Sequence, residues 1–397
     1  MNSPSDLDRT YNNHVACFLQ SIRLKNILSF KDAKLPLDSL NVLIGPNAAG
    51  KSNLIDVIGL LQAAPRDLTG AILRGGGAPA WIRKGENGAS VAGIECELSL
   101  GSETLSYSLE FSSADRAFVI ERETLRRASP RGAAAHFERS AAGARIGKHF
   151  RNGGTAGQTA PIASSKSVFS EFRVPGTPVT RLGAELGRIR IYRSFDTGPQ
   201  APARTGADTS LPKEFLDDTG YNLAVVLNEM QFNGTIGRVN EYLKRLADQF
   251  EGVRVSLDSG IARVAVKERG IEQPVPAVRL SDGTLKFLCL MAGLLHDNPP
   301  PLICLEEPEL GLHPDALQLV AEVLRDAAER SQLIVTTHSD ALVDALSGKP
   351  EAVVVCERGL DGATSFQRLS RADLSLWLER YRLGELWRKG EIGGNRW

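Results

Sequence analysis

The residues with the clearest chemical meaning form the run Gly45-Pro46-Asn47-Ala48-Ala49-Gly50-Lys51-Ser52, which matches the pattern G-x4-G-K-[ST]. Its glycines let the backbone wrap so that consecutive N–H groups face inward as an anion-binding nest. A helix that begins here adds the partial positive charge of its N-terminus. Lys51 is expected to reach the β- and γ-phosphates of a nucleotide, and the Ser52 hydroxyl to ligate Mg²⁺. The run, with the adjoining Asn53, therefore predicts a nucleotide-binding loop.

Two adjacent carboxylates form the second chemical group, because Glu306 and Glu307 end the apolar run Leu302-Ile303-Cys304-Leu305. An NTPase needs a carboxylate at the end of a buried strand for the metal, and a base that orients the attacking water. Glu306 is the predicted metal ligand and Glu307 the predicted base. Side chains alternate along a strand, so the two should point in opposite directions. The alternative interpretation is a pair of acids at a solvated strand end.

The elements that must position these groups follow from the spacing of apolar residues. Residues 18 to about 110 alternate in the manner of a sheet, and residues 40–44 form the strand that leads into the loop. The helix after the loop has apolar residues at i, i+3, i+4 and i+7, namely Leu54, Val57, Ile58 and Leu61. From residue 280 helices and strands alternate, which is typical of a parallel sheet covered by helices.

The middle of the chain has a different character. From about residue 112 to 180 the periodicity fades and Gly, Ala and Arg become frequent, so we expect an excursion with long loops. Residues 211–250 have a helical pattern, and a two-strand pattern with the turn Asp258-Ser259-Gly260 follows. A single short helix is expected near the C-terminal end, with the stripe Leu374, Trp377, Leu378 and Tyr381.

Three further segments make the chain resemble a known family. Leu280-Ser281-Asp282-Gly283-Thr284 resembles the ABC-type signature, usually LSGGQ, which lies at a helix N-terminus. The run from Glu307 to Pro314 resembles the segment that contains the D-loop, and Thr336-Thr337-His338-Ser339 resembles the switch segment. In this order, the motifs resemble the RecF- and OLD-like branch of ABC-type ATPases, also called AAA-type core-domain ATPases.

The resemblance implies an α/β fold, an ABC-type P-loop ATPase head that hydrolyses ATP with Mg²⁺. Ser281, Asp282 and Gly283 of one subunit would close on the γ-phosphate held by the other, and His338 would contact that phosphate. Two departures stand out: Glu306 replaces the usual Asp, and no Q-loop glutamine can be assigned, since Gln62 comes too soon after Lys51.

The predicted organisation has five parts. They are an N-terminal tail (1–17), an N-terminal β-rich ATPase lobe (18–111), an inserted middle region of basic loops, helices and a hairpin (112–270), a C-terminal ATPase lobe with a parallel α/β core (271–368), and a C-terminal helix and tail (369–397). The gap before the signature lacks the heptads of an SMC-type arm. Too few residues follow the last core strand for a TOPRIM nuclease domain, so a nuclease would have to be another protein.

Composition excludes some settings and leaves others open. The 47 basic and 47 acidic residues cancel, so any nucleic-acid contact must come from a local patch. There is no apolar run of about 18 residues, which argues against a membrane span. The start of the chain does not resemble a signal peptide. The five cysteines are scattered without a CxxC pair, and a reducing cytoplasm is the expected location.

Partners are suggested by two segments. Residues 116–151 hold nine basic and three acidic residues, a net +6, and DNA contact or a protein-docking loop fits equally well. The aromatic residues of the C-terminal tail either complete the core or dock a partner. We therefore expect an ATP-sandwiched homodimer or higher oligomer that clamps DNA or gates a separate effector or nuclease, in bacterial genome maintenance or antiphage defence. The alternative is a non-hydrolysing platform that binds ATP and scaffolds a toxin or nuclease subunit.

Overall fold

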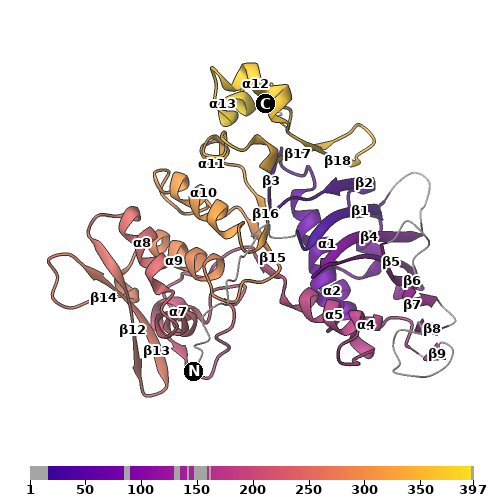
Figure 1. Cartoon of the computed structure of the whole chain (residues 1–397), viewed down its shortest axis with the longest axis horizontal. Coiled ribbons are helices and arrows are strands. Elements are labelled where there is room, and N and C mark those ends of the chain that lie inside the picture. The colour runs from indigo at the N-terminus through magenta and orange to yellow at the C-terminus, as the bar shows by residue number, and fades with distance from the viewer. Residues whose placement is uncertain are drawn as a thin grey trace, which may run out of the picture.

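The fold is described from a computed structural model of the 397-residue chain, in which residues 17–84, 90–128, 135–140, 143–146, 159–160 and 162–394 are described (Figure 1). The predicted tail before residue 17, the last three residues and much of the basic stretch 116–151, Arg131, Lys148 and Arg151 included, lie outside these ranges.

A six-stranded sheet forms the centre of the molecule. Its order is β10 (Arg190–Tyr192), β15 (Leu302–Glu306), β16 (Gln332–Thr336), β3 (Leu40–Ile44), β17 (Val353–Arg358) and β18 (Thr364–Arg368). Successive neighbours from β10 to β17 are parallel, and β18 is antiparallel to β17. The parallel core that the helix–strand alternation predicts is therefore confirmed.

Each face of the central sheet is covered by a separate hydrophobic core. Leu302 and Cys304 of β15 belong to the core shared with α1 (Lys51–Ala63), α5 (Pro178–Arg188) and a large antiparallel sheet. Ile303 and Leu305 belong to the core on the other face, which contains α9 (Asp282–Leu294), α10 (Ala316–Ala327) and α11 (Asp340–Asp344). Burial on both faces explains why these strands are continuous apolar runs.

The large sheet is antiparallel and has eight strands. In spatial order they are β2 (Phe30–Pro36), β1 (Leu19–Ile27), β4 (Val91–Leu100), β5 (Glu103–Ala114), β6 (Ala117–Arg127), β7 (Ala135–Ser140), β8 (Gly143–Ile146) and β9 (Thr159–Ala160). It forms the indigo to magenta lobe in Figure 1. The short helices α2 (Leu68–Arg74), α3 (Ala78–Trp81) and α4 (Val168–Glu171) complete this lobe.

The structure corrects the expected organisation of the middle region. The boundary predicted between residues 111 and 112 lies inside β5, and β6 to β9 continue the same sheet. Strand β10 also belongs to the central sheet. The alternation of β6 is hidden because Glu123 faces the interior, where its carboxylate accepts hydrogen bonds from Tyr107 (2.9 Å), Ser167 (2.6 Å) and the Val168 N–H (2.9 Å).

A helical lobe occupies the opposite side of the central sheet (left in Figure 1). It contains α6 (Pro202–Thr205), α7 (Leu223–Phe232), α8 (Ile236–Leu246), the hairpin β12 (Phe250–Asp258) and β13 (Ile261–Glu268), and two short strands, β11 (Ala207–Asp208) and β14 (Val275–Pro276). The hairpin turn is as predicted, with positive φ at Ser259 and Gly260. Residues 211–222, for which the sequence pattern predicts a helix, are not helical, because the Asn222 side chain bonds the backbone of residues 212, 215 and 217.

Two helices, rather than the single one expected, end the described chain: α12 (Arg371–Leu378) and α13 (Leu383–Arg388). Gly384 lies so close to α11 that an added Cβ would be 2.2 Å from the Asp340 carbonyl oxygen. Its N–H donates to the Asp344 carboxylate at 2.6 Å. Among the described helices none has both the length and the apolar character that crossing a bilayer requires.

Candidate functional site

Residues 45–52 join β3 to α1 in a loop whose backbone requires glycine at two positions. Gly45 and Gly50 have φ of 147° and 101°. A Cβ at Gly45 would lie 2.3 Å from the Cys356 carbonyl oxygen, and one at Gly50 would lie 2.3 Å from Thr364 Oγ1. The loop is therefore held against β17 and β18, and the predicted anion nest has the backbone it needs.

Lys51 is the first residue of α1, and its side chain lies inside the loop. Its Nζ donates to the Gly45 carbonyl at 2.8 Å and to the Pro46 carbonyl at 3.1 Å, and the residue is only 6% exposed. Burial lowers the pKa of the Lys51 ammonium, while the nearby Cys356 and Glu307 raise it. The loop thus surrounds a cation held by two carbonyls, which a phosphate group can replace as partners.

Ser52 and Glu306 meet as the sequence predicts. The Ser52 hydroxyl donates to Glu306 Oε2 at 3.2 Å, at the C-terminal end of β15. Burial raises the pKa of Glu306, and the neighbouring Arg193 opposes that shift. Arg193 also pairs with Asp56 at 2.6 Å. A hydroxyl and two carboxylates beside a phosphate-binding loop are the hard oxygen donors that suit Mg²⁺, so the residues fit that ion.

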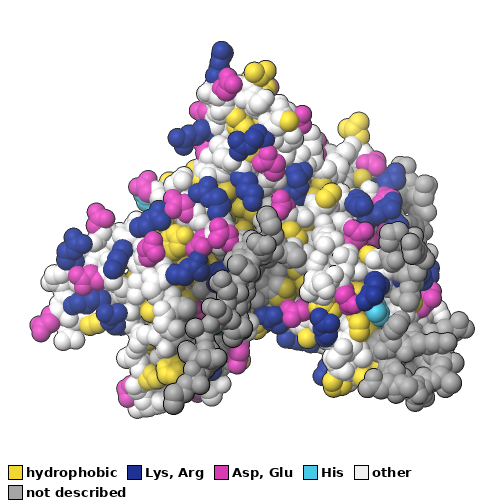
Figure 2. Space-filling view, in the orientation of Figure 1, with side chains coloured by type: hydrophobic (Ala, Val, Ile, Leu, Met, Phe, Trp, Pro, Cys, Tyr) yellow, Lys and Arg dark blue, Asp and Glu magenta, His cyan; other side chains and the backbone are white. Residues whose placement is uncertain are grey.

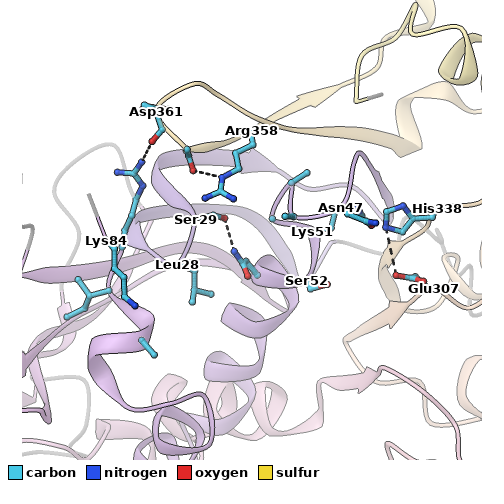
Figure 3. A pocket seen from close by; sticks show the side chains of 18 residues that line it. Leu28, Ser29, Asn47, Lys51, Ser52, Lys84, Glu307, His338, Arg358 and Asp361 are labelled. Atoms are coloured by element: carbon cyan, nitrogen blue, oxygen red, sulfur yellow. Dashed lines mark hydrogen bonds and ion pairs between the residues drawn. The ribbon is translucent and has the colours of Figure 1, made fainter. Parts of the chain in front are cut away.

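Glu307 faces the same site. Its direction is set by the turn that follows β15, and not by the alternation of side chains along the strand. The strand ends at Glu306, and Glu307 adopts the left-handed conformation with φ of 46° while its N–H donates to the Thr336 carbonyl at 2.9 Å. Such backbone strain in a non-glycine residue is typical of functional sites. The turn directs the carboxylate toward the loop, with its Oε1 3.9 Å from Nε2 of His338 (Figure 3).

His338 lies just after β16, opposite Glu307. Burial and the nearby Lys51 lower the pKa of His338, and Glu307 raises it to a lesser degree. The imidazole is therefore mostly neutral at pH 7 and can donate one hydrogen bond to an anion. Its backbone is fixed by Glu309, whose Oε1 accepts from the His338 N–H at 3.0 Å and from the Thr337 hydroxyl at 2.5 Å. Sequence reasoning did not identify this positioning role of Glu309.

Lys51, Ser52, Glu307 and His338 line one pocket of about 550 Å³, a size suited to a small organic ligand, whereas Glu306 is not among its lining residues. The predicted residues 47–53, Glu307 and His338 are among its lining residues. The other lining residues, missed by sequence reasoning, are Leu28, Ser29, Ala80, Ile82, Arg83, Lys84, Arg358, Asp361 and Gly362. Figure 3 shows Lys51 and Ser52 in the middle of the pocket, with His338 and Glu307 at one end and Lys84 and Asp361 at the other.

The signature residues Ser281, Asp282 and Gly283 are not among the residues that line this pocket. They begin α9, where the Ser281 hydroxyl caps the helix by accepting from the Thr284 N–H at 3.1 Å. Ser281 and Asp282 are exposed, and Arg204 pairs with Asp282 at 2.5 Å. The structure therefore places the loop and the signature of one chain at separate surfaces.

Comparison with known proteins matches the segments of the chain that contain these motifs. A protein family described as "AAA domain, putative AbiEii toxin, Type IV TA system" matches residues 40–173 and 188–344, which is most of the chain. The chain belongs to this AAA-domain family. The match spans the phosphate loop, Glu306, Glu307 and His338. Among curated proteins, none matches the chain significantly.

Solved structures confirm the fold of this AAA-domain protein. It resembles an SMC head bound to the C-winged helix domain of ScpA, with 15% identity, a TM-score of 0.56 and coverage of 90% of this chain and 99% of that one. It also resembles an SMC head with an extended coiled coil bound to the C-terminal domain of ScpA from Pyrococcus furiosus, with 15% identity, a TM-score of 0.52 and coverage of 91% and 98%. The predicted RecF/OLD-like ABC-type ATPase head is thus confirmed in family and fold.

Two charged residues beside Glu306 were not found from the sequence of this family member. Asp56 lies on α1 one turn after Ser52, and Arg193 follows β10. Gln62, considered for the Q-loop, instead donates to the Ile189 carbonyl at 2.7 Å. The strand 190–192 followed by an arginine is the one signal for Arg193 in the sequence, and it lies within the predicted middle region 112–270.

Proposed function

We propose that this AAA-domain protein is a Mg²⁺-dependent ATPase that dimerises around ATP and acts as an ATP-gated switch for an effector partner or for DNA. The observation that carries the proposal is the convergence of Lys51, Ser52, Glu307 and His338 on one pocket, with Glu306 bonded to Ser52. Family membership and the ABC-type fold support a nucleotide-binding role independently of this geometry.

Each residue has a task in hydrolysis. The backbone N–H groups of the loop and Lys51 would hold the phosphates, and Ser52 and Glu306 would hold Mg²⁺, which neutralises developing charge on the phosphate oxygens. Glu307 would accept the proton of the water that adds to the γ-phosphorus as the bond to the β-phosphate oxygen breaks, which yields ADP and phosphate. Neutral His338 would donate a hydrogen bond to the γ-phosphate.

A second copy would complete the site. The N-terminus of α9 offers a hydroxyl, free N–H groups and a positive dipole end, and these suit an anion. Ser281 and Asp282 are exposed and lie outside the pocket of their own chain. Head-to-tail pairing of two chains would therefore place each signature against the phosphates that the other chain holds.

A protein partner is favoured over DNA as the output. The family description names a toxin and a toxin–antitoxin system, and this supports a role in defence or genome maintenance. In the described part of the basic stretch, Arg122 and Arg126 pair with Glu138, and Arg127 pairs with Glu103. Figure 2 shows basic and acidic side chains interspersed over the face in view. Such ion pairing weakens the case for phosphate tracking by this surface.

The second candidate function is a platform that binds ATP without hydrolysing it and restrains a toxin or nuclease subunit. The observation that favours it is the ion pair between Glu306 and Arg193, because this pair engages the predicted metal ligand. A platform of this kind would respond to nucleotide binding and release alone.

ATP turnover measured with the purified chain separates the two functions. Lys51→Ala should lose ATP binding, and Glu307→Gln should keep binding and lose turnover by roughly 10²–10³-fold. Arg245→Gln is the control, since Arg245 pairs with Glu322 at 2.6 Å and is not among the residues that line the pocket. Wild-type binding without turnover would support the platform, and full turnover in Glu307→Gln would remove that residue as the base.

A further inference from the structure

Arg193 is a charged side chain at the predicted metal ligands to which hydrolysis assigns no task. It follows β10, which runs parallel to β15 with Tyr192 opposite Leu305. The residues after these partners, Arg193 and Glu306, therefore lie at the carboxyl ends of the two strands, on the same edge of the sheet. Parallel strands bring their carboxyl ends together, and this explains how residues 113 positions apart in sequence become neighbours.

The contacts of Arg193 surround the hydroxyl expected to bind the metal. One guanidinium nitrogen pairs with Glu306 Oε1, and the other lies 2.6 Å from Asp56 Oδ1. The second oxygen of Glu306 accepts the hydrogen bond from Ser52. Because Asp56 is four residues after Ser52 on α1, both project from one side of that helix. Arg193 thus spans two carboxylates that flank Ser52.

Electrostatics gives this bridge a consequence for metal binding. Without a cation, Glu306 and Asp56 would repel each other, because both carboxylates lie within ion-pair distance of the same guanidinium. A guanidinium remains charged at any physiological pH and offers donors only. A divalent ion needs the same oxygens, so it competes with the guanidinium. Because 45% of its side chain is exposed, Arg193 can turn into solvent when the metal displaces it from the carboxylates.

We propose that Arg193 is a positioning residue that competes with Mg²⁺ for Glu306 and Asp56, and so sets the Mg²⁺ concentration at which ATP loads. It holds the two carboxylates close together and oriented around Ser52 until the metal binds them. The inference rests on the proposed function, because it assumes that this pocket takes Mg²⁺ with ATP. A purely structural bridge between β10 and α1 would affect folding but would leave the metal requirement of nucleotide binding unchanged.

The test is binding of a fluorescent ATP analogue over a range of free Mg²⁺, with a parallel measurement in EDTA. Arg193→Gln should lower the Mg²⁺ concentration at half-maximal binding by about tenfold, equivalent to about 1.4 kcal/mol. Its affinity in EDTA should stay at the wild-type value, because Lys51 and the loop are untouched. Arg193→Lys keeps a competing cation, so its Mg²⁺ midpoint should stay closer to that of the wild type. The control Arg245→Gln should have the wild-type midpoint.

Two results would overturn the inference. An unchanged Mg²⁺ midpoint in Arg193→Gln would show that the guanidinium does not compete with the metal. Weaker binding of Arg193→Gln in EDTA would show that Arg193 contacts the phosphates directly. A wild-type protein that binds no nucleotide under either condition would instead refute the proposed function, so the two failures can be told apart.

Discussion

Thr364 is expected to control nucleotide affinity although it lies more than 300 residues from the phosphate loop in sequence. Its hydroxyl lies 2.8 Å from the Ala49 carbonyl oxygen and 2.7 Å from the Ser29 hydroxyl, and Asn53 donates to that serine at 2.8 Å. Thr364 is 3% exposed. The network therefore fastens the loop to β18 through Thr364, which is not among the residues that line the pocket. Thr364→Val removes only the hydroxyl and preserves the shape of the side chain.

The magnitude follows from which groups lose a partner. Ser29 keeps the hydrogen bond from Asn53, whereas the Ala49 carbonyl loses the partner that Thr364 supplies. A buried acceptor left without a partner costs about 1–3 kcal/mol. If about 1 kcal/mol of that cost opposes closure of the loop on the phosphate, ATP affinity falls about fivefold. Thr364→Ser is the matched control, because it keeps the hydroxyl and loses one methyl group.

Thermal unfolding and equilibrium binding of a fluorescent ATP analogue are the two assays. Thr364→Val should lower both the melting temperature and the affinity. Thr364→Ser should lower the melting temperature only, because the buried methyl group that it loses contributes roughly 1 kcal/mol to the free energy of unfolding. Wild-type affinity in Thr364→Val, or an equal loss in both variants, would refute the view that this hydroxyl holds the loop in its binding geometry.

Two further predictions concern the loop and the switch segment. Gly45→Ala should abolish ATP binding, because its Cβ would lie 2.3 Å from the Cys356 carbonyl oxygen. Gly348→Ala is the control, since its Cβ would meet nothing within 4 Å. Equal ATP binding by both variants would contradict the prediction. Burial raises the pKa of Glu309, so the folded protein opposes its ionisation and loses stability as pH rises above the ordinary value of 4.5. Glu309→Gln keeps an acceptor for Thr337 and should gain melting temperature relative to wild type as pH rises from 4 to 8; a difference independent of pH would be inconsistent with this origin.

The sequence alone predicts those parts of the site whose residues are consecutive in the chain. The loop 45–52, the strand ending at Glu306 and the helix cap at Ser281 each depend on neighbours within a few positions, and the structure has all three. The roles of Glu307 and His338 remain proposals, yet their placement at one pocket agrees with the motifs. Local spacing thus predicts local geometry well.

Long-range packing accounts for what the sequence did not reveal. Arg193 reaches Glu306 only because β10 is placed beside β15. The lining of the pocket combines Ser29 with Asp361, which come from turns at distant points of the chain. Strand β6 escaped detection because a buried ion-paired network replaces its apolar alternation. None of these arrangements leaves a periodic pattern in a single sequence.

The central claim, that two chains share ATP, is tested most directly by light scattering of Glu307→Gln with and without Mg²⁺ and ATP. This variant should bind ATP without turning it over, and ATP should therefore double its molar mass. Adding Ser281→Arg should prevent the increase while ATP binding persists, because Ser281 lies outside the pocket of its own chain. A mass that does not change with ATP in Glu307→Gln, or that still doubles in the Ser281→Arg combination, would contradict the two-chain site.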